Sequence, residues 1–143
     1  MANPALAKLA GLVGEWTTEG THPMVPGKTF HGRVTFEWIE DGAFLRMRSR
    51  TDEPEIPDGV AVFGSDDEHG THSMLYFDER KVSRRYEVEV RDDGLRWSRD
   101  SSKLAQRYDL RIVDGGARMI GKGELSRDGA SWEGDLSLTY ERR

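Results

Sequence analysis

The stretch VTFEWIEDGAFLRMRS, residues 34–49, predicts two strands joined by a turn at Asp41-Gly42. A hairpin with this turn at its centre fixes which residues face each other. The pairs on one face are Val34–Ser49, Phe36–Met47 and Trp38–Leu45, and those on the other are Thr35–Arg48 and Glu37–Arg46. The first face is mainly apolar and the second carries opposite charges, so the stretch predicts a hairpin with one buried side.

Further turns predict hairpins in the same way. For Asp128-Gly129 the expected inner pairs are Leu125–Trp132, Gly121–Leu136, Met119–Leu138 and Ala117–Tyr140, and Lys122 meets Asp135 on the other side. For Asp93-Gly94 they are Val90–Trp97, Val88–Arg99 and Tyr86–Ser101. A third turn, Asp114-Gly115-Gly116, connects the strand of Tyr108, Leu110 and Ile112 to that of Met119. All of these turns indicate one shared inner face.

Short alternating segments continue to the end of the chain, separated by turns that contain Gly and Asp. We expect about ten strands, near residues 14–22, 29–39, 43–50, 59–64, 72–78, 83–91, 95–99, 106–113, 117–126 and 131–140. Before them, Leu6, Leu9 and Leu12 have helical spacing and predict one short N-terminal helix. The expected fold is an all-β, antiparallel, up-and-down barrel, because closure removes exposed strand edges. The structural alternative is a flattened sandwich with a packed core.

The composition limits the classes of protein. A chain of 143 residues fits a single domain, residues 1–143, large enough to bury a core. A net charge of −5 argues against nucleic-acid binding, and the lack of cysteine excludes disulfides and thiolate metal sites. Residues 1–12 lack the apolar core of a signal peptide, and no later segment resembles a membrane span. We therefore expect a cytoplasmic protein without membrane partners, either a monomer or a homodimer.

The sequence Thr21-His22-Pro23 follows a strand that begins near Trp16. If Trp16 points inward, the two-residue period of a strand carries His22 inward as well. Pro23 favours an extended backbone at His22, and Pro26-Gly27 suits the centre of a type II turn. His22 is thus a candidate ligand contact or general base, with a purely structural histidine as the alternative.

Arg99 falls on the same predicted inner face as Trp97, Val88 and Tyr86. A buried guanidinium cannot lose its proton, so it needs an internal carboxylate or an acidic ligand group. The alternative is that Arg99 lies at the strand end and extends into water. The candidate ligand-binding residues are Trp16, His22, Trp38, Tyr86, Trp97, Arg99, Tyr108 and Tyr140. The inner glycines Gly121, Gly123 and Gly134 are expected to widen the interior.

No metal site is expected, because His69 and His72 on their own lack a convincing ligand spacing. Gly-rich phosphate loops and serine nucleophile elbows are also lacking.

The segment Gly14-Glu15-Trp16 after a short helix resembles the Gly-x-Trp signature that opens lipocalin and related calycin barrels. In those families an Arg near the end of the last strand packs over the Trp, a part that Arg142 or Arg143 would play here. Together with LVGEWTTEGTHP, FEWIEDGAFL and LSLTYERR, this segment resembles small bacterial calycin-like barrels, which are similar to nitrobindins and fatty-acid-binding proteins.

The resemblance implies a ten-stranded barrel with a small-molecule cavity. Nitrobindins take their iron ligand from a late histidine, whereas this sequence has no histidine after His72. No haem cofactor is therefore expected. In the fatty-acid-binding relatives, internal Arg and Tyr residues hold the ligand carboxylate, which implies a similar role for Arg99 with Tyr86 or Tyr140.

Three functions follow from this fold. The first is a binding protein that holds a small, partly apolar ligand inside the barrel. In one version of this hypothesis the ligand is anionic. The second is an isomerase or cyclase with His22 as general base and Arg99 or a tyrosine stabilising an oxyanion. The third is an interaction module with a filled core, whose outer face carries Arg46, Arg48 and Glu37.

Overall fold

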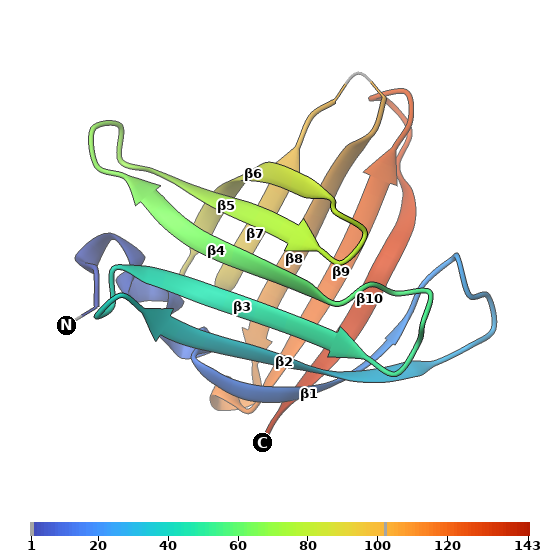
Figure 1. Ribbon diagram of the computed structural model, residues 1–143, viewed down its shortest axis with the longest axis horizontal. Helices are drawn as coiled ribbons and strands as arrows, with labels where there is room; N and C mark the ends of the chain where they lie inside the picture. The colour runs from blue at the N-terminus through green and yellow to red at the C-terminus, as the bar shows by residue number, and fades with distance from the viewer. Residues whose placement is uncertain (1, 102) are drawn as a thin grey trace.

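The computed structural model describes residues 2–101 and 103–143 and consists of a closed antiparallel barrel (Figure 1). Its strands are β1 Gly14–Thr21, β2 Phe30–Ile39, β3 Phe44–Thr51, β4 Gly59–Asp66, β5 Thr71–Asp78, β6 Ser83–Arg91, β7 Gly94–Arg99, β8 Ala105–Val113, β9 Arg118–Ser126 and β10 Glu133–Arg142. Each strand pairs with its neighbours in sequence, and β1 pairs with β10. The expected barrel is confirmed, and each predicted strand lies within two residues of its observed bounds.

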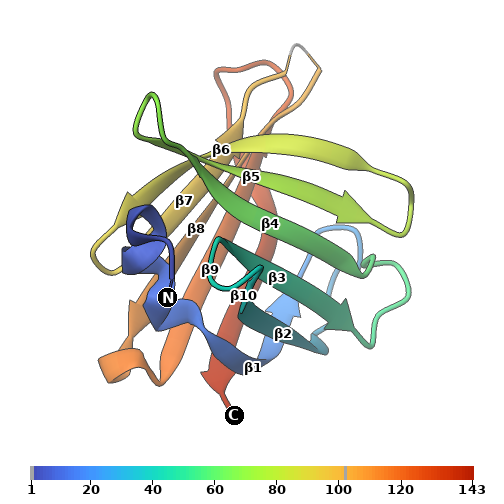
Figure 2. The same ribbon diagram turned by 60° about the vertical axis from the view of Figure 1, so that its left-hand side comes forward.

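One end of the barrel is covered by the 3-10 helix η1, Pro4–Leu12 (Figure 2). Its buried residues, Leu6, Leu9 and Leu12, recur every third residue, which matches the three residues per turn of a 3-10 helix. Asn3 caps the helix by accepting a hydrogen bond from the Ala5 N–H at 3.0 Å. The buried leucines belong to the same core as the barrel interior, so the helix closes this end. No helix in the described ranges is long and apolar enough to cross a membrane.

At the covered end, Trp16 and Arg142 connect the first and last strands. The Trp16 ring is fully buried, and its Nε1 donates to the Leu12 carbonyl at 2.9 Å. The Arg142 guanidinium lies 4.1 Å from the centre of this ring and donates to the carbonyls of Gly11, Val13 and Gly116. Of the two candidates at the chain end, Arg142 therefore packs over the Trp.

The hairpin of β2 and β3 has the predicted register, including Phe36 opposite Met47 and Glu37 opposite Arg46. Its turn holds Glu40, Asp41 and Gly42 at positive φ. The predicted inner side of β1 is also confirmed, because Trp16, Thr18 and Gly20 are buried while the residues between them are exposed. The turn at Pro26-Gly27 is type II as expected, with Gly27 at φ +73° and the Lys28 N–H bonded to the Val25 carbonyl.

The register predicted for β6 and β7 is wrong by two residues. Trp97 faces Val88 rather than Val90, and Arg91 faces Gly94, so the turn is centred on Asp92-Asp93. Gly94 is the first residue of β7 and pairs with Arg111 on β8. A Cβ there would lie 1.9 Å from the Leu110 carbonyl oxygen, so this position requires glycine. A two-residue shift preserves which side chains point inward, so Trp97 and Arg99 still share the inner face.

The register predicted for β9 and β10 is also wrong. Tyr140 rather than Leu138 faces Met119, Leu138 rather than Leu136 faces Gly121, and Ser137 rather than Asp135 faces Lys122. The turn is longer than two residues because the Asp128 carboxylate accepts hydrogen bonds from the N–H groups of Ala130 and Ser131. An irregularity between Gly134 and Ser137 adds a further shift. This β-bulge directs both Asp135 and Leu136 into the interior.

Candidate functional site

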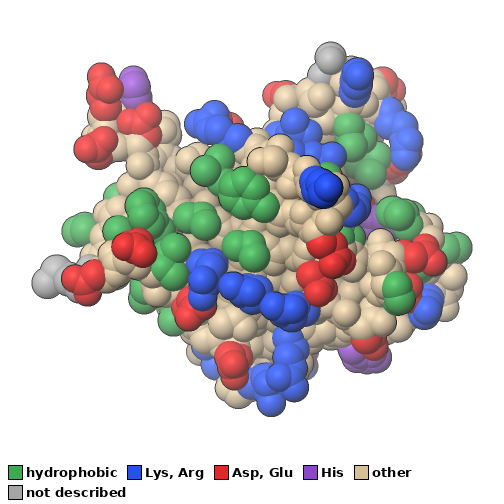
Figure 3. All heavy atoms as spheres, in the orientation of Figure 1, with side chains coloured by type: hydrophobic (Ala, Val, Ile, Leu, Met, Phe, Trp, Pro, Cys, Tyr) green, Lys and Arg blue, Asp and Glu red, His purple; other side chains and the backbone are tan. Residues whose placement is uncertain are grey.

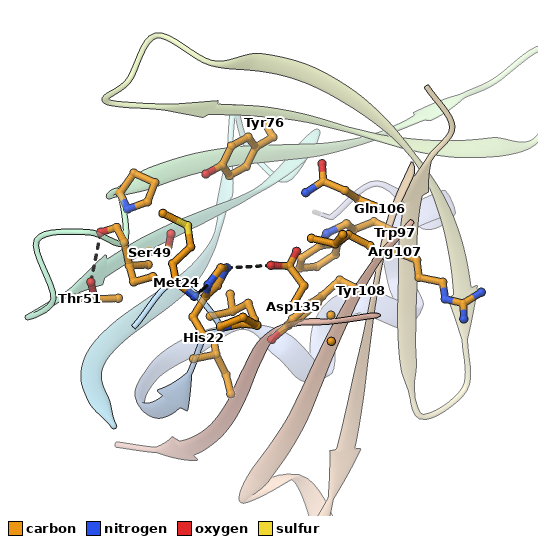
Figure 4. Close-up of a pocket in the computed structure, with 18 of the residues that line it drawn as sticks. His22, Met24, Ser49, Thr51, Tyr76, Trp97, Gln106, Arg107, Tyr108 and Asp135 are labelled. Carbon is orange, nitrogen blue, oxygen red and sulfur yellow. Dashed lines mark hydrogen bonds and ion pairs between the residues drawn. The ribbon is translucent and has the colours of Figure 1, made fainter. Parts of the chain in front are cut away.

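The barrel encloses a cavity of about 440 Å³ on the side away from η1. This volume lies within the range of small-molecule sites. Figure 4 shows the polar residues that line it, among them His22, Asp135, Gln106 and Tyr76. The apolar part of the wall includes Phe30, Val34, Met47, Met74, Trp97, Leu136 and Leu138.

His22 and Asp135 are in direct polar contact at this cavity. His22 Nε2 lies 2.7 Å from Asp135 Oδ1, and the two side chains are 16% and 17% exposed. His22 Nδ1 accepts a hydrogen bond from the Met24 N–H at 3.0 Å. Because Nδ1 is an acceptor, the ring proton lies on Nε2 and is donated to Asp135. Both ring nitrogens are thus engaged, and the pair fixes the segment after β1 against the bulge of β10.

A second polar cluster brings together β6, β7 and β8. Arg84 Nη1 donates to Gln106 Oε1 at 3.1 Å, and the Tyr86 hydroxyl donates to the same oxygen at 3.3 Å. Arg99 faces Gln106 in the ladder, and its guanidinium lies 6.0 Å from the centre of the Tyr86 ring. Burial raises the pKa of Tyr86, so its hydroxyl stays protonated near neutral pH.

In the part of the chain that the structure describes, neither Arg84 nor Arg99 has a carboxylate within ion-pair distance. Arg84 is half-buried and lines the cavity, where its remaining N–H groups can meet an anion. Arg99 lies at the end of β7, outside the cavity wall.

The wall opposite His22 contains Tyr76, whose hydroxyl donates to Asp78 Oδ2 at 2.8 Å. Arg80 binds the same carboxylate through Nε and Nη2, and the Asp78 side chain is fully buried. Burial acts to raise the pKa of Asp78, but the hydrogen bonds from Arg80 and Tyr76 lower it overall. This carboxylate is therefore charged and already satisfied, and its bond with Tyr76 stabilises the wall.

At the floor of the cavity, the hydroxyls of Tyr108 and Tyr140 are 2.8 Å apart. Tyr108 and Tyr140 are only 6% and 2% exposed. Burial raises the pKa of both phenols. The Trp97 ring stacks on Tyr108 with centroids 4.6 Å apart and an angle of 20° between the planes. The floor is thus a rigid aromatic layer with a neutral hydroxyl pair.

Glycine widens the interior less than the sequence suggests. A Cβ at Gly121 would lie 1.8 Å from the Tyr108 hydroxyl oxygen, so the tyrosine fills the space that this glycine leaves. Gly123 is likewise close to Tyr108, at 3.2 Å from the ring to the site of a Cβ. Gly134 is exposed and has nothing within 4 Å. Gly121 and Gly123 therefore add no open space beside the cavity, whereas Gly134 lines the cavity and faces open space.

Of the eight candidate ligand-binding residues, five line the cavity: His22, Tyr86, Trp97, Tyr108 and Tyr140. Trp16 is in the core beneath the cavity, and Trp38 packs against that core near the covered end. Arg84 was missed by the sequence reasoning, although it shares the inward alternation of Tyr86 and Val88. Asp135 was predicted on the outer side, because a regular hairpin without the shift between Gly134 and Ser137 places it there.

The geometry of the histidines bears on haem and metal binding. A histidine ligand to haem within the cavity would have to be His22, and it would have to give up its bond with Met24 or with Asp135. His72 lies away from the cavity and its Nε2 is 2.7 Å from the Ala5 carbonyl. Across residues 2–101 and 103–143, no group of three His, Asp or Glu side chains is arranged to hold a metal ion.

The outer wall of the barrel carries both charge and apolar surface. Figure 3 shows hydrophobic side chains over β4 and β5 beside Lys and Arg side chains over β3. The exposed apolar residues include Phe44, Leu75 and Phe77. Arg46 is paired with Glu37 on the same wall. The hypothesis of an interaction module expects a filled core, whereas the barrel contains a cavity.

Comparison with known proteins shows the fold alone. No protein-family model and no curated protein matches the chain. Among solved structures, the crystal structure of Rv2717c from M. tuberculosis is similar, with a TM-score of 0.71 and 14% sequence identity. The match covers 100% of this chain and 99% of that chain. The chain is thus similar in fold, over its whole length, to a small β-barrel protein.

Proposed function

We propose that this protein binds a small, partly apolar, anionic molecule inside its barrel. A closed barrel with an internal cavity is compatible with ligand binding, and apolar walls with a few polar anchors are typical of such sites. The charges on the cavity wall favour an anionic ligand over a neutral one.

The cavity wall is richer in cations than the chain as a whole. Five arginines and three carboxylates line it, whereas the complete chain has a net charge of −5. Positive charge concentrated in a concave site raises the local concentration of anions and the rate at which they enter. The arginines are Arg50, Arg80, Arg84, Arg107 and Arg127, and the carboxylates are Glu55, Glu133 and Asp135.

Arg84 carries the proposal. Of those arginines, Arg80, Arg107 and Arg127 lie within 3.1 Å of a carboxylate oxygen, and Arg50 lies 3.8 Å from Asp58. Arg84 instead bonds the neutral Gln106 and keeps its charge without a carboxylate partner in the described chain. A ligand carboxylate at Arg84 would also be within reach of the Gln106 amide group. Arg99 stands next to this position and adds to its positive charge.

A direct test is the affinity for dodecanoate, measured by isothermal titration calorimetry on the wild type and on Arg84→Gln. We expect the substitution to weaken binding about tenfold or more, because a charge-assisted hydrogen bond is lost. Arg85→Gln is the matched control, since Arg85 lies on the outer face of the same strand and pairs with Glu87. Equal affinities of Arg84→Gln and the wild type would contradict the proposal, as would a lack of dodecanoate binding by the wild type.

The two other functions have less support. His22 as general base would need a free lone pair on one ring nitrogen, yet Nδ1 accepts the Met24 N–H and Nε2 faces Asp135. The outer wall of β3 to β5 would suit a surface interaction, but it does not account for the internal cavity. The packing of Arg142 over Trp16 supports the finer proposal that this barrel is of the calycin type.

A further inference from the structure

The Tyr108–Tyr140 pair at the cavity floor has one hydroxyl proton more than the described chain accepts. Each hydroxyl carries one proton, and the 2.8 Å contact uses one of the two. The other proton has no acceptor among residues 2–101 and 103–143. Since Tyr140 is only 2% exposed and Tyr108 only 6%, the floor contains a buried donor that the protein itself does not satisfy.

This donor is held in place and stays protonated. Tyr108 is fixed between the Trp97 ring on one side and Gly121 on the other. Burial raises the pKa of both phenols, so neither hydroxyl ionises near neutral pH. Both tyrosines line the cavity, so an acceptor carried by a bound molecule can reach the pair.

The floor is far from Arg84. The Arg84 guanidinium bonds Gln106, whereas the Tyr108 hydroxyl lies against Gly121, which pairs with Leu110. Gln106 and Leu110 are four residues apart on β8, which corresponds to about 13 Å along the strand. A molecule anchored at Arg84 would therefore present the remote end of its apolar chain to the hydroxyl pair.

We propose that the Tyr108–Tyr140 floor binds a carbonyl oxygen at the apolar end of the ligand, so that the preferred ligand class is a medium-chain oxo acid. This inference rests on the proposed function, which supplies the anchor at Arg84. A ketone suits the floor because it accepts the unmatched proton and brings no donor of its own.

The test compares dodecanoate with its analogue that carries a ketone next to the terminal methyl group. Calorimetry gives the ratio of the two affinities for the wild type and for the double variant Tyr108→Phe/Tyr140→Phe. We expect the wild type to prefer the ketone about three- to tenfold more strongly than the double variant does. This difference corresponds to one net hydrogen bond. Removing both hydroxyls together leaves no partner unsatisfied, so the double variant is expected to fold.

An equal ratio in the wild type and the double variant would overturn the inference. An isomer with its ketone near the carboxylate tests the same point without a variant. The wild type is expected to bind this isomer more weakly than the terminal ketone, and the reverse order would also overturn the inference. Binding of dodecanoate with no preference for either ketone contradicts the floor site alone, whereas failure to bind any of the three acids contradicts the proposed function.

Discussion

The imidazole of His22 and the carboxylate of Asp135 meet at 2.7 Å, so that the end of β1 is joined to the bulge of β10. The Met24 N–H donates to the other ring nitrogen of His22. A histidine with both nitrogens engaged is suited to holding the chain in place. We therefore interpret His22 as a positioning residue for the segment between β1 and β2.

Replacing Asp135 with alanine is expected to lower the free energy of unfolding by about 1–2 kcal/mol, because the substitution leaves a partly buried N–H of His22 without an acceptor. Urea denaturation followed by tryptophan fluorescence measures the change. Asp135→Asn keeps an oxygen at the same place, so its loss should be smaller. The interpretation fails if Asp135→Ala is as stable as the wild type.

The Arg142 side chain is expected to be important at the covered end. Arg142→Ala removes the guanidinium from the Trp16 ring and leaves three backbone carbonyls without their donor. We expect a loss of about 1–2 kcal/mol in thermal unfolding. Arg143→Ala is the matched control, because the Arg143 side chain has no hydrogen bond or ion pair with the described residues. Equal losses from the two substitutions would contradict this role of Arg142.

The sequence was sufficient to predict the barrel because its alternation repeats in every strand. The hairpin of β2 and β3 was predictable in register, since the turn at Asp41-Gly42 keeps Phe36 and Trp38 on one face and pairs Glu37 with Arg46. The shift at Gly94 did not affect which residues face inward, because it involves an even number of residues. Alternation along strands therefore predicts faces more reliably than it predicts partners.

The candidate site was less predictable, because it depends on local departures from alternation. Asp135 turns inward at a β-bulge beside Gly134, and a glycine in a strand is compatible with a bulge, a bend or a close contact alike. The Tyr108–Tyr140 contact depends on Gly121, which the sequence marks only as a glycine in a strand. Arg84, in contrast, lies at a regular inward position two residues before Tyr86. The alternation that places Tyr86 inside the barrel therefore predicts an inward Arg84 as well.

Gly121→Ala is expected to destabilise the protein by about 1–3 kcal/mol, because the new methyl group would overlap the Tyr108 hydroxyl and force the ring to move. Thermal unfolding measures this loss. Gly134→Ala is the control on the adjacent strand, where nothing lies within 4 Å, and it should change stability by less than about 0.5 kcal/mol. If both variants are equally stable, the close approach of Tyr108 to Gly121 is incorrect.

The four tyrosines of the chain are expected to make the fold sensitive to alkali. Burial raises the pKa of Tyr76, Tyr86, Tyr108 and Tyr140 in the folded state. Below about pH 10 these phenols are protonated whether the chain is folded or not, so their contribution to stability is fully present. As the pH rises above that value, the unfolded chain releases phenolic protons that the folded chain retains, and the free energy of unfolding falls.

Urea midpoints measured from about pH 8 to about pH 11 should therefore decline at the alkaline end. The double variant Tyr108→Phe/Tyr140→Phe has two fewer buried phenols, so its midpoint should decline less steeply over the same interval. Phenolate absorbance gives an independent measure, since the wild type should ionise its tyrosines mainly as it unfolds. A decline of equal steepness in both proteins would mean that Tyr108 and Tyr140 ionise as readily in the folded barrel as in the unfolded chain. The hydroxyl pair would then not be the buried, neutral group on which the proposed ligand site at the cavity floor depends.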